Sequence, residues 1–102
     1  MYGTIMRLQV QPGQMEALMA WGSSGEGNSI PGYLKEYLFE MESDANDLYL
    51  VLIFTDKASY DAYIQSARRQ LRMAEMRTML AADPVYHDGP LIYTNAVTAD
   101  GS

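Results

Sequence analysis

The sequence contains no cysteine and only one histidine, His87. A chain without cysteine forms no disulfide, thiolate metal ligand or thiol nucleophile, and it suits a reducing compartment, so we expect a cytoplasmic protein. A metal site would need carboxylates as most of its ligands, and no H-E-x-x-H or similar spacing is present. The glycine-rich residues 22–30 match neither the G-x-S-x-G nor the G-x-G-x-x-G register. We therefore expect no bound metal and no other resident cofactor.

Basic residues are also scarce, since seven Lys and Arg stand against thirteen Asp and Glu and the net charge is -6. A field of this sign repels phosphate backbones and anionic lipid surfaces, so we predict no nucleic-acid partner and no membrane partner. The longest apolar run, residues 48–54, is far shorter than the roughly 20 residues of a membrane helix. With 102 residues, 48% of them hydrophobic, the chain fits one domain with a buried core. We expect this domain over residues 1–97 and a flexible tail over 98–102.

The hydrophobic pattern predicts the order strand, helix, strand, strand, helix, strand. This order fits the split βαβ, or ferredoxin-like, α+β fold, in which two helices cover one face of a four-stranded antiparallel sheet. A polar turn is expected at 43–47, a kink is favoured in the polar stretch 65–70, and the Gly- and Ser-rich residues 22–32 are expected to form a mobile loop, a candidate lid. The predicted strands are 2–10, 33–41, 48–54 and 85–97, the last interrupted at 88–90, and the predicted helices are 13–21 and 55–83.

The second face of the predicted sheet is also expected to be covered. Residues 48–54 are apolar throughout, and the strand over 33–41 has apolar side chains on both sides. An antiparallel sheet that faced water would be polar on one side. In so small a chain the simplest cover is a second copy, so we predict a homodimer joined sheet to sheet.

Aromatic and methionine side chains are abundant, with eight Tyr, two Phe, one Trp and eight Met. Several of them lie on the faces that should enclose the space between helices and sheet, where they could line an apolar pocket for a flat aromatic or lipophilic ligand. Alternatively these side chains fill the core. The rings proposed for the pocket are Trp21, Tyr37, Phe39, Phe54, Tyr60 and Tyr63.

Two further features allow a functional and a structural interpretation. His87 has a side chain that titrates near neutral pH, so it could move the proton of a phenol, or it could be an exposed or hydrogen-bonded structural residue. Four arginines of the second helix either receive an anionic ligand or form a solvated face that balances the acidic surplus. These arginines are Arg68, Arg69, Arg72 and Arg77.

Four short stretches resemble the antibiotic biosynthesis monooxygenase family of dimeric α+β barrels, and the likeness extends over nearly the whole chain. The stretches are residues 10–14 (VQPGQ), 30–33 (IPGY), 52–63 (LIFTDKASYDAY) and 83–89 (DPVYHDG). The resemblance implies a ferredoxin-like protomer whose sheet packs on that of its twin and whose pocket lies between sheet and helices. It also implies a reaction in which O2 oxidises a phenolic polyketide to a quinone without flavin, metal or haem.

The resemblance implies three polar site positions, and this chain keeps one of them. The family's Trp corresponds to Phe54 and its Asn to Leu50, whereas its Tyr corresponds to Tyr60. Buried Leu and Phe side chains donate no hydrogen bond to a phenolate. The haem-degrading branch of the family has an axial His on the second helix, and this helix has none.

These observations predict a cofactor-independent monooxygenase that acts on a small aromatic substrate, with Tyr60 and His87 handling protons. Two alternatives stay open: a non-catalytic dimeric barrel that binds an apolar metabolite, which the changes at Leu50 and Phe54 favour, and an isomerase-type enzyme on the same fold. The expected substrate-binding residues are Trp21, Tyr37, Phe39, Leu50, Phe54 and Tyr63.

Overall fold

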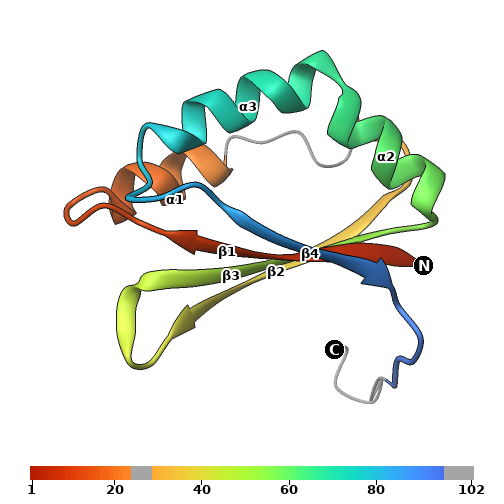
Figure 1. Cartoon of the computed structure of the whole chain (residues 1–102), viewed down its shortest axis with the longest axis horizontal. Coiled ribbons are helices and arrows are strands. Elements are labelled where there is room, and N and C mark those ends of the chain that lie inside the picture. Colours follow the sequence, from red (N-terminus) through yellow and green to blue (C-terminus); the bar gives the residue numbers. More distant parts are fainter. Residues whose placement is uncertain (24–28, 96–102) are drawn as a thin grey trace.

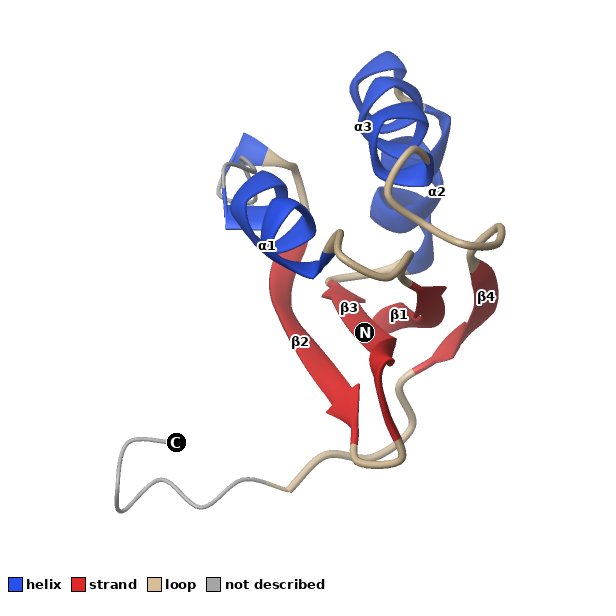
Figure 2. Ribbon diagram, turned by 90° about the vertical axis from the view of Figure 1, so that its left-hand side faces the viewer, coloured by secondary structure: helices blue, strands red, loops and turns tan. Residues whose placement is uncertain are grey.

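The computed structural model describes residues 1–23 and 29–95 and has a two-layer α+β architecture (Figure 1). Four strands form one antiparallel sheet in the order β2-β3-β1-β4. All three helices lie on the same face of this sheet, which confirms the predicted ferredoxin-like fold (Figure 2). The elements are β1 (Tyr2–Gln9), α1 (Met15–Ser23), β2 (Tyr33–Met41), β3 (Asp44–Phe54), α2 (Lys57–Gln65), α3 (Ala67–Arg77) and β4 (Val85–Pro90).

The core fills the space between the sheet and the helices. Along β1, alternate side chains such as Met6 and Leu8 point toward the helices and are buried, because successive residues of a strand point to opposite faces. From the adjacent strand β3, Leu48 and Leu52 are buried on the same face, and Phe54 has no exposed surface. The two central strands therefore provide most of the apolar floor on which the helices pack.

The predicted second helix is two helices. The chain breaks at Ser66, which is extended (φ -70°, ψ 148°) and serves both ends: its hydroxyl accepts a hydrogen bond from the Arg69 amide and donates one to the Tyr63 carbonyl. The break changes the helical phase, so the stripe expected to continue through Leu71 turns outward. In its place the core-facing residues of α3 are Arg69, Met73 and Met76.

The hairpin and the last strand also differ from the prediction. β3 begins at Asp44, because the turn consists of residues 42 and 43 only and the polar residues 44–47 already pair with their neighbours. Asp47 accepts two hydrogen bonds from Arg7, at 2.9 and 3.1 Å. β4 ends at Pro90, and residues 91–95 have no regular structure. The middle of the expected lid and the expected C-terminal tail lie outside the described residues.

The second face of the sheet is not covered by any other described element. Its side chains include Ile5, Tyr37, Phe39 and Val85, all of them exposed large hydrophobic residues. We call this surface the open face. No helix in the described part of the chain is long and apolar enough to cross a membrane.

Candidate functional site

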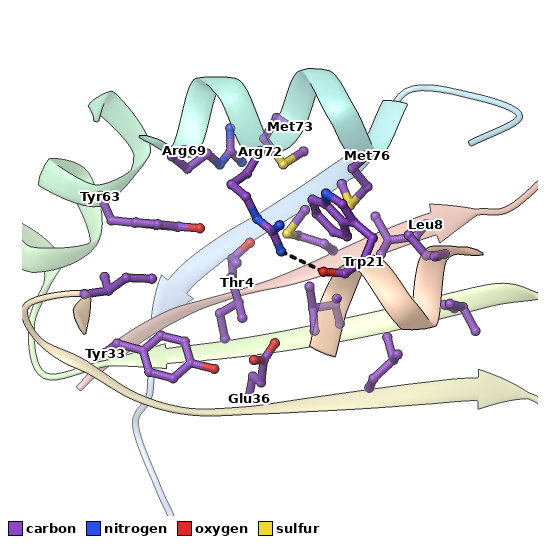
Figure 3. A pocket seen from close by; sticks show the side chains of 18 of the residues that line it. Thr4, Leu8, Trp21, Tyr33, Glu36, Tyr63, Arg69, Arg72, Met73 and Met76 are labelled. Atoms are coloured by element: carbon purple, nitrogen blue, oxygen red, sulfur yellow. Dashed lines mark hydrogen bonds between the residues drawn. The ribbon is translucent and has the colours of Figure 1, made fainter. Parts of the chain in front are cut away.

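A cavity of about 720 Å³ lies between the sheet and the helices (Figure 3). This volume is within the ~300–1,000 Å³ typical of sites for small organic ligands. Its floor consists mainly of Leu and Met side chains from β1 and β3, and its roof of side chains from α1 and α3. Floor residues are Met6, Leu8, Leu48, Leu50 and Leu52, and roof residues include Leu18, Trp21, Arg72, Met73 and Met76.

One end of the cavity is a wall of aromatic rings. Tyr33 and Tyr63 line the cavity, and both pack against the fully buried ring of Phe54, with centroids 5.8 and 5.5 Å away. Burial raises the pKa of both phenols, and the neighbouring Glu36 carboxylate raises that of Tyr33 further. At neutral pH both tyrosines are therefore neutral hydroxyl groups at the edge of an apolar space.

Tyr33 reaches this wall through a tight turn and a β-bulge. The turn over residues 30–33 closes with a hydrogen bond from the Tyr33 amide to the Ile30 carbonyl (3.1 Å), and Gly32 supplies the positive φ (+78°) that such a turn requires. Tyr33 pairs with Phe54 and Lys35 pairs with Ile53, the residue directly before Phe54, so Leu34 is an extra residue in β2. The bulge puts Tyr33 on the helix-side face.

The cavity is lined by charges of both signs. Glu36, from the edge strand β2, is the only carboxylate among the described lining residues, and it lies beside Tyr33 (Figure 3). On the opposite side, α3 contributes Arg68, Arg69 and Arg72. An acceptor for protons and a group of cations therefore face the same apolar space from opposite walls.

A stack of side chains fixes the roof where α1 meets α3. The guanidinium of Arg72 lies 3.8 Å from the ring centroid of Trp21 and donates a hydrogen bond to the Trp21 carbonyl oxygen (3.2 Å). The Trp21 indole in turn donates to a carboxylate oxygen of Glu75 at 3.1 Å. Trp21 is thus held with its ring against the cavity by a cation–π contact and two hydrogen bonds.

Of the residues predicted to bind substrate, Trp21, Leu50 and Tyr63 line the cavity, and Phe54 lies directly behind its aromatic wall. Tyr37 and Phe39 do not line it. Beyond the bulge at Leu34, alternation along β2 turns these two rings to the open face and turns Glu36 and Leu38 inward. The expectation that both rings bind inside the pocket is therefore wrong for this cavity.

The two predicted catalytic residues are on opposite sides of the sheet and neither lines the cavity. Tyr60 is buried beneath α2, and its hydroxyl donates a hydrogen bond to Asp88 at 2.9 Å. His87 pairs with Ile5, on the open face. The register of β4 on β1 decides this placement, because it turns Asp88 and not His87 toward the helices.

Sequence reasoning missed Tyr33, Glu36 and the buried position of Arg69. The Pro-Gly pair before Tyr33 signals the turn, but alternation alone does not reveal the bulge that follows. Arg69 has a clearer signal, because it shares the i, i+4, i+7 spacing of Met73 and Met76 and therefore one helix face.

No protein-family model and no curated protein matches the sequence. Solved structures do match. A protein from Chloroflexus aurantiacus, provisionally assigned as an antibiotic biosynthesis monooxygenase, is 24% identical with a TM-score of 0.75, over 93% of this chain and 96% of its own. A protein from Bordetella bronchiseptica with the same provisional assignment is 18% identical with a TM-score of 0.79, over 90% and 97%.

A third match is SnoaB, a cofactor-independent oxygenase from Streptomyces nogalater, in a point-mutant form. It is 14% identical with a TM-score of 0.75, over 91% of this chain and 94% of its own. The chain therefore has the fold of the antibiotic biosynthesis monooxygenases, as its sequence motifs predicted. At these identities the likeness shows the fold, and a fold by itself does not define a reaction.

Proposed function

We propose that this protein is a member of the antibiotic biosynthesis monooxygenases that oxidises a small aromatic or phenolic substrate with O2 and without a cofactor. The observation that carries the proposal is the cavity itself. It is apolar, it has the volume of a small polycyclic ligand, and it ends in an aromatic wall next to one carboxylate. A flat phenol would stack against this wall with its hydroxyl group near Glu36.

The proposed chemistry assigns the proton transfer to Glu36, because Tyr60 and His87 do not reach the cavity. The phenolic proton passes to the Glu36 carboxylate, and the electron-rich anion that remains gives electrons to O2 and forms a carbon–oxygen bond. The peroxide takes the proton back from Glu36, and the O–O bond and the C–H bond of the same ring carbon then break to give a quinone and water. One oxygen atom of O2 therefore enters the product and the other leaves as water. Tyr33 lies beside Glu36 at the same end of the cavity, where its hydroxyl group can orient the phenol.

A second candidate function is a binding protein for the same class of ligand without turnover. Its support is the chemistry of two positions: Leu50 lines the cavity without a polar atom, and Phe54 lies behind the wall. Stabilising the negative charge that develops during oxidation requires hydrogen-bond donors, and these side chains supply none. In this case the cavity would hold its ligand mainly by apolar contact.

Oxygen uptake separates the two functions. Purified, metal-stripped protein is mixed with hydroxynaphthalenes, anthrones and small quinols, and the melting temperature is recorded for each compound. A monooxygenase gives uptake above the autoxidation blank that Glu36→Gln abolishes. The matched control is Glu40→Gln, which makes the same charge change on the same strand outside the cavity. Stabilisation without uptake supports the binding protein, and neither effect with any compound contradicts both functions.

We further propose that the protein is a homodimer joined through the open face. An apolar sheet surface of this kind is costly to leave in water, and a second copy of the same surface covers it by symmetry. Phe39, with 54% of its surface exposed, lies on this face together with Ile5, Tyr37 and Val85.

A further inference from the structure

We propose that the natural ligand of the cavity carries a carboxylate, which Arg69 and Arg72 bind beneath α3. The inference rests on the proposed function for the aromatic character of the ligand and adds the chemical group that the cavity selects. It assigns a ligand-binding role to two arginines for which the sequence left a solvated helix face as an alternative.

Arg69 is the residue that makes this site unusual. Its side chain lines the cavity, yet the residue is only 7% exposed. Burying a guanidinium is costly unless a carboxylate neutralises it. Among the described residues no carboxylate pairs with Arg69, and its one side-chain hydrogen bond goes to the hydroxyl of Tyr86, at 2.5 Å. Within residues 1–23 and 29–95, the buried charge therefore has no carboxylate as counter-ion.

The free hydrogen-bonding capacity of Arg69 opens into the cavity. A guanidinium has five N–H donors, and the bond to Tyr86 uses one nitrogen. No fully buried side-chain nitrogen or oxygen in the described residues lacks a partner. The remaining guanidinium nitrogens thus keep access to open space, and the space that this residue lines is the cavity.

Arg72 is placed to share the same anion. It follows Arg69 by three residues, so the two side chains leave the same face of α3 as neighbours. Figure 3 shows both side chains leaving α3 on the side of the cavity, with Arg72 reaching down to the Trp21 carbonyl. Each planar guanidinium can bind the oxygens of a carboxylate in a fork-shaped geometry, so both arginines have the chemistry to hold one carboxylate of the ligand.

The charge around the cavity has the sign that this ligand needs. Three arginines and one glutamate are among its described lining residues, although the chain as a whole carries a net charge of -6. Low-dielectric apolar walls strengthen the local field of such a group. Arg68 has its own partner in Ser29, at 2.9 Å, and lies exposed at the start of α3, so the inference does not depend on it.

A purely structural role for Arg69 explains less of this arrangement. Arg69 does hold α3 to β4 through Tyr86, by the hydrogen bond and by a cation–π contact of 5.1 Å. A neutral side chain could make that link without the cost of burying a charge. An anion that arrives with the ligand compensates the charge, and this gives the cavity specificity as well as affinity.

The test compares 1-hydroxy-2-naphthoate with 1-hydroxy-2-naphthamide, which have the same rings and the same phenol and differ in charge. Calorimetry with the full chain at neutral pH should show binding of the acid at least about tenfold tighter, the size of one good charge-assisted hydrogen bond. Arg69→Gln and Arg72→Gln should each reduce this preference, and together they should abolish it. Arg77→Gln, on the same helix but outside the cavity, should leave it unchanged.

Two outcomes overturn the inference: equal binding of acid and amide by the unaltered protein, or a preference that survives both substitutions. Arg69→Lys covers the case in which Arg69→Gln does not fold, because it keeps the charge and loses the fork geometry, so it should retain part of the preference. Oxygen uptake in the same samples distinguishes the failures. Acid preference without uptake contradicts the monooxygenase and leaves the carboxylate site standing, whereas uptake without acid preference does the reverse.

Discussion

Gly32 shows how a single residue positions the wall of the cavity. Its φ of +78° is in the region that favours glycine, and a Cβ atom there would overlap the side chain of Ser59. We expect Gly32→Ala to lower the free energy of unfolding by about 3 kcal/mol, the sum of backbone strain and steric overlap. Urea denaturation followed by circular dichroism measures the change.

Gly13 provides the control, because it also has a positive φ (+86°) but a Cβ atom there would meet nothing within 4 Å. Gly13→Ala should therefore cost only the backbone term, about 1–2 kcal/mol. Equal losses for the two variants would mean that the contact with Ser59 is unimportant and that the turn relaxes around the new side chain.

Tyr60 makes a residue-scale prediction about alkaline pH. Burial and the bond to Asp88 raise the pKa of Tyr60 above its usual value near 10 in the unfolded chain. The unfolded chain then loses its proton first as the pH rises. Stability that is complete below pH 10 is therefore lost above it, by at most about 1.4 kcal/mol per pH unit for one proton. Tyr60→Phe should make this fall less steep in chemical denaturation between pH 9 and 11.

Tyr93→Phe is the matched control, since Tyr93 is 74% exposed and follows the end of β4. It should leave the pH dependence as it is in the unaltered protein. Parallel pH profiles for Tyr60→Phe and the unaltered protein would show that another group governs alkaline unfolding.

At the scale of the elements, the periodicity of hydrophobic residues predicts most helices and strands. The features that it does not predict are the two places where the periodicity is interrupted. β2 appears over the predicted residues, but the bulge at Leu34 reverses the faces of its two halves, so Tyr33 lines the cavity and Tyr37 does not. Likewise the break at Ser66 rotates α3 relative to α2, which buries Arg69. The bulge depends on how β2 pairs with β3, and the break depends on the cap that Ser66 forms. The hydrophobic pattern within a single element carries no information on either interaction.

Replacing Ser66, the residue between α2 and α3, should test what causes the break between these two helices. Its hydroxyl caps α3 at the Arg69 amide (3.1 Å) and binds the Tyr63 carbonyl (2.7 Å). Ser66→Ala should cost about 1 kcal/mol of unfolding free energy, typical of a lost N-cap. Hydrogen exchange at Arg69 and Gln70 should become faster, because both amides lie in the first turn of α3.

Ser66→Asp separates the two bonds of this residue. An aspartate still accepts the hydrogen bond from the Arg69 amide but donates none to Tyr63, so it should restore most of the lost stability. If Ser66→Ala leaves both the stability and the exchange unchanged, the geometry of the backbone rather than the cap sets the break.

At the scale of the whole molecule, the sequence predicted a surface that the single chain leaves uncovered. The expectation came from the uninterrupted apolar residues of β3 and the two apolar sides of β2, and the structure leaves Phe39 and its neighbours exposed on the open face. The register that places these side chains opposite the helices also separates the proposed dimer surface from the cavity. Changes to one surface should therefore leave the other intact.

Phe39→Lys tests the dimer, because it puts a charge on the apolar open face at its most exposed ring. Light scattering coupled to gel filtration should give twice the chain mass of 11.4 kDa for the unaltered protein at micromolar concentration, and the single mass for the variant. Leu71→Lys is the control: Leu71 is 64% exposed but belongs to the helical layer, so this variant should remain a dimer. A single mass for the unaltered protein would contradict the dimer, and the apolar open face would then have to be covered by a different partner or remain in water at the cost of solubility.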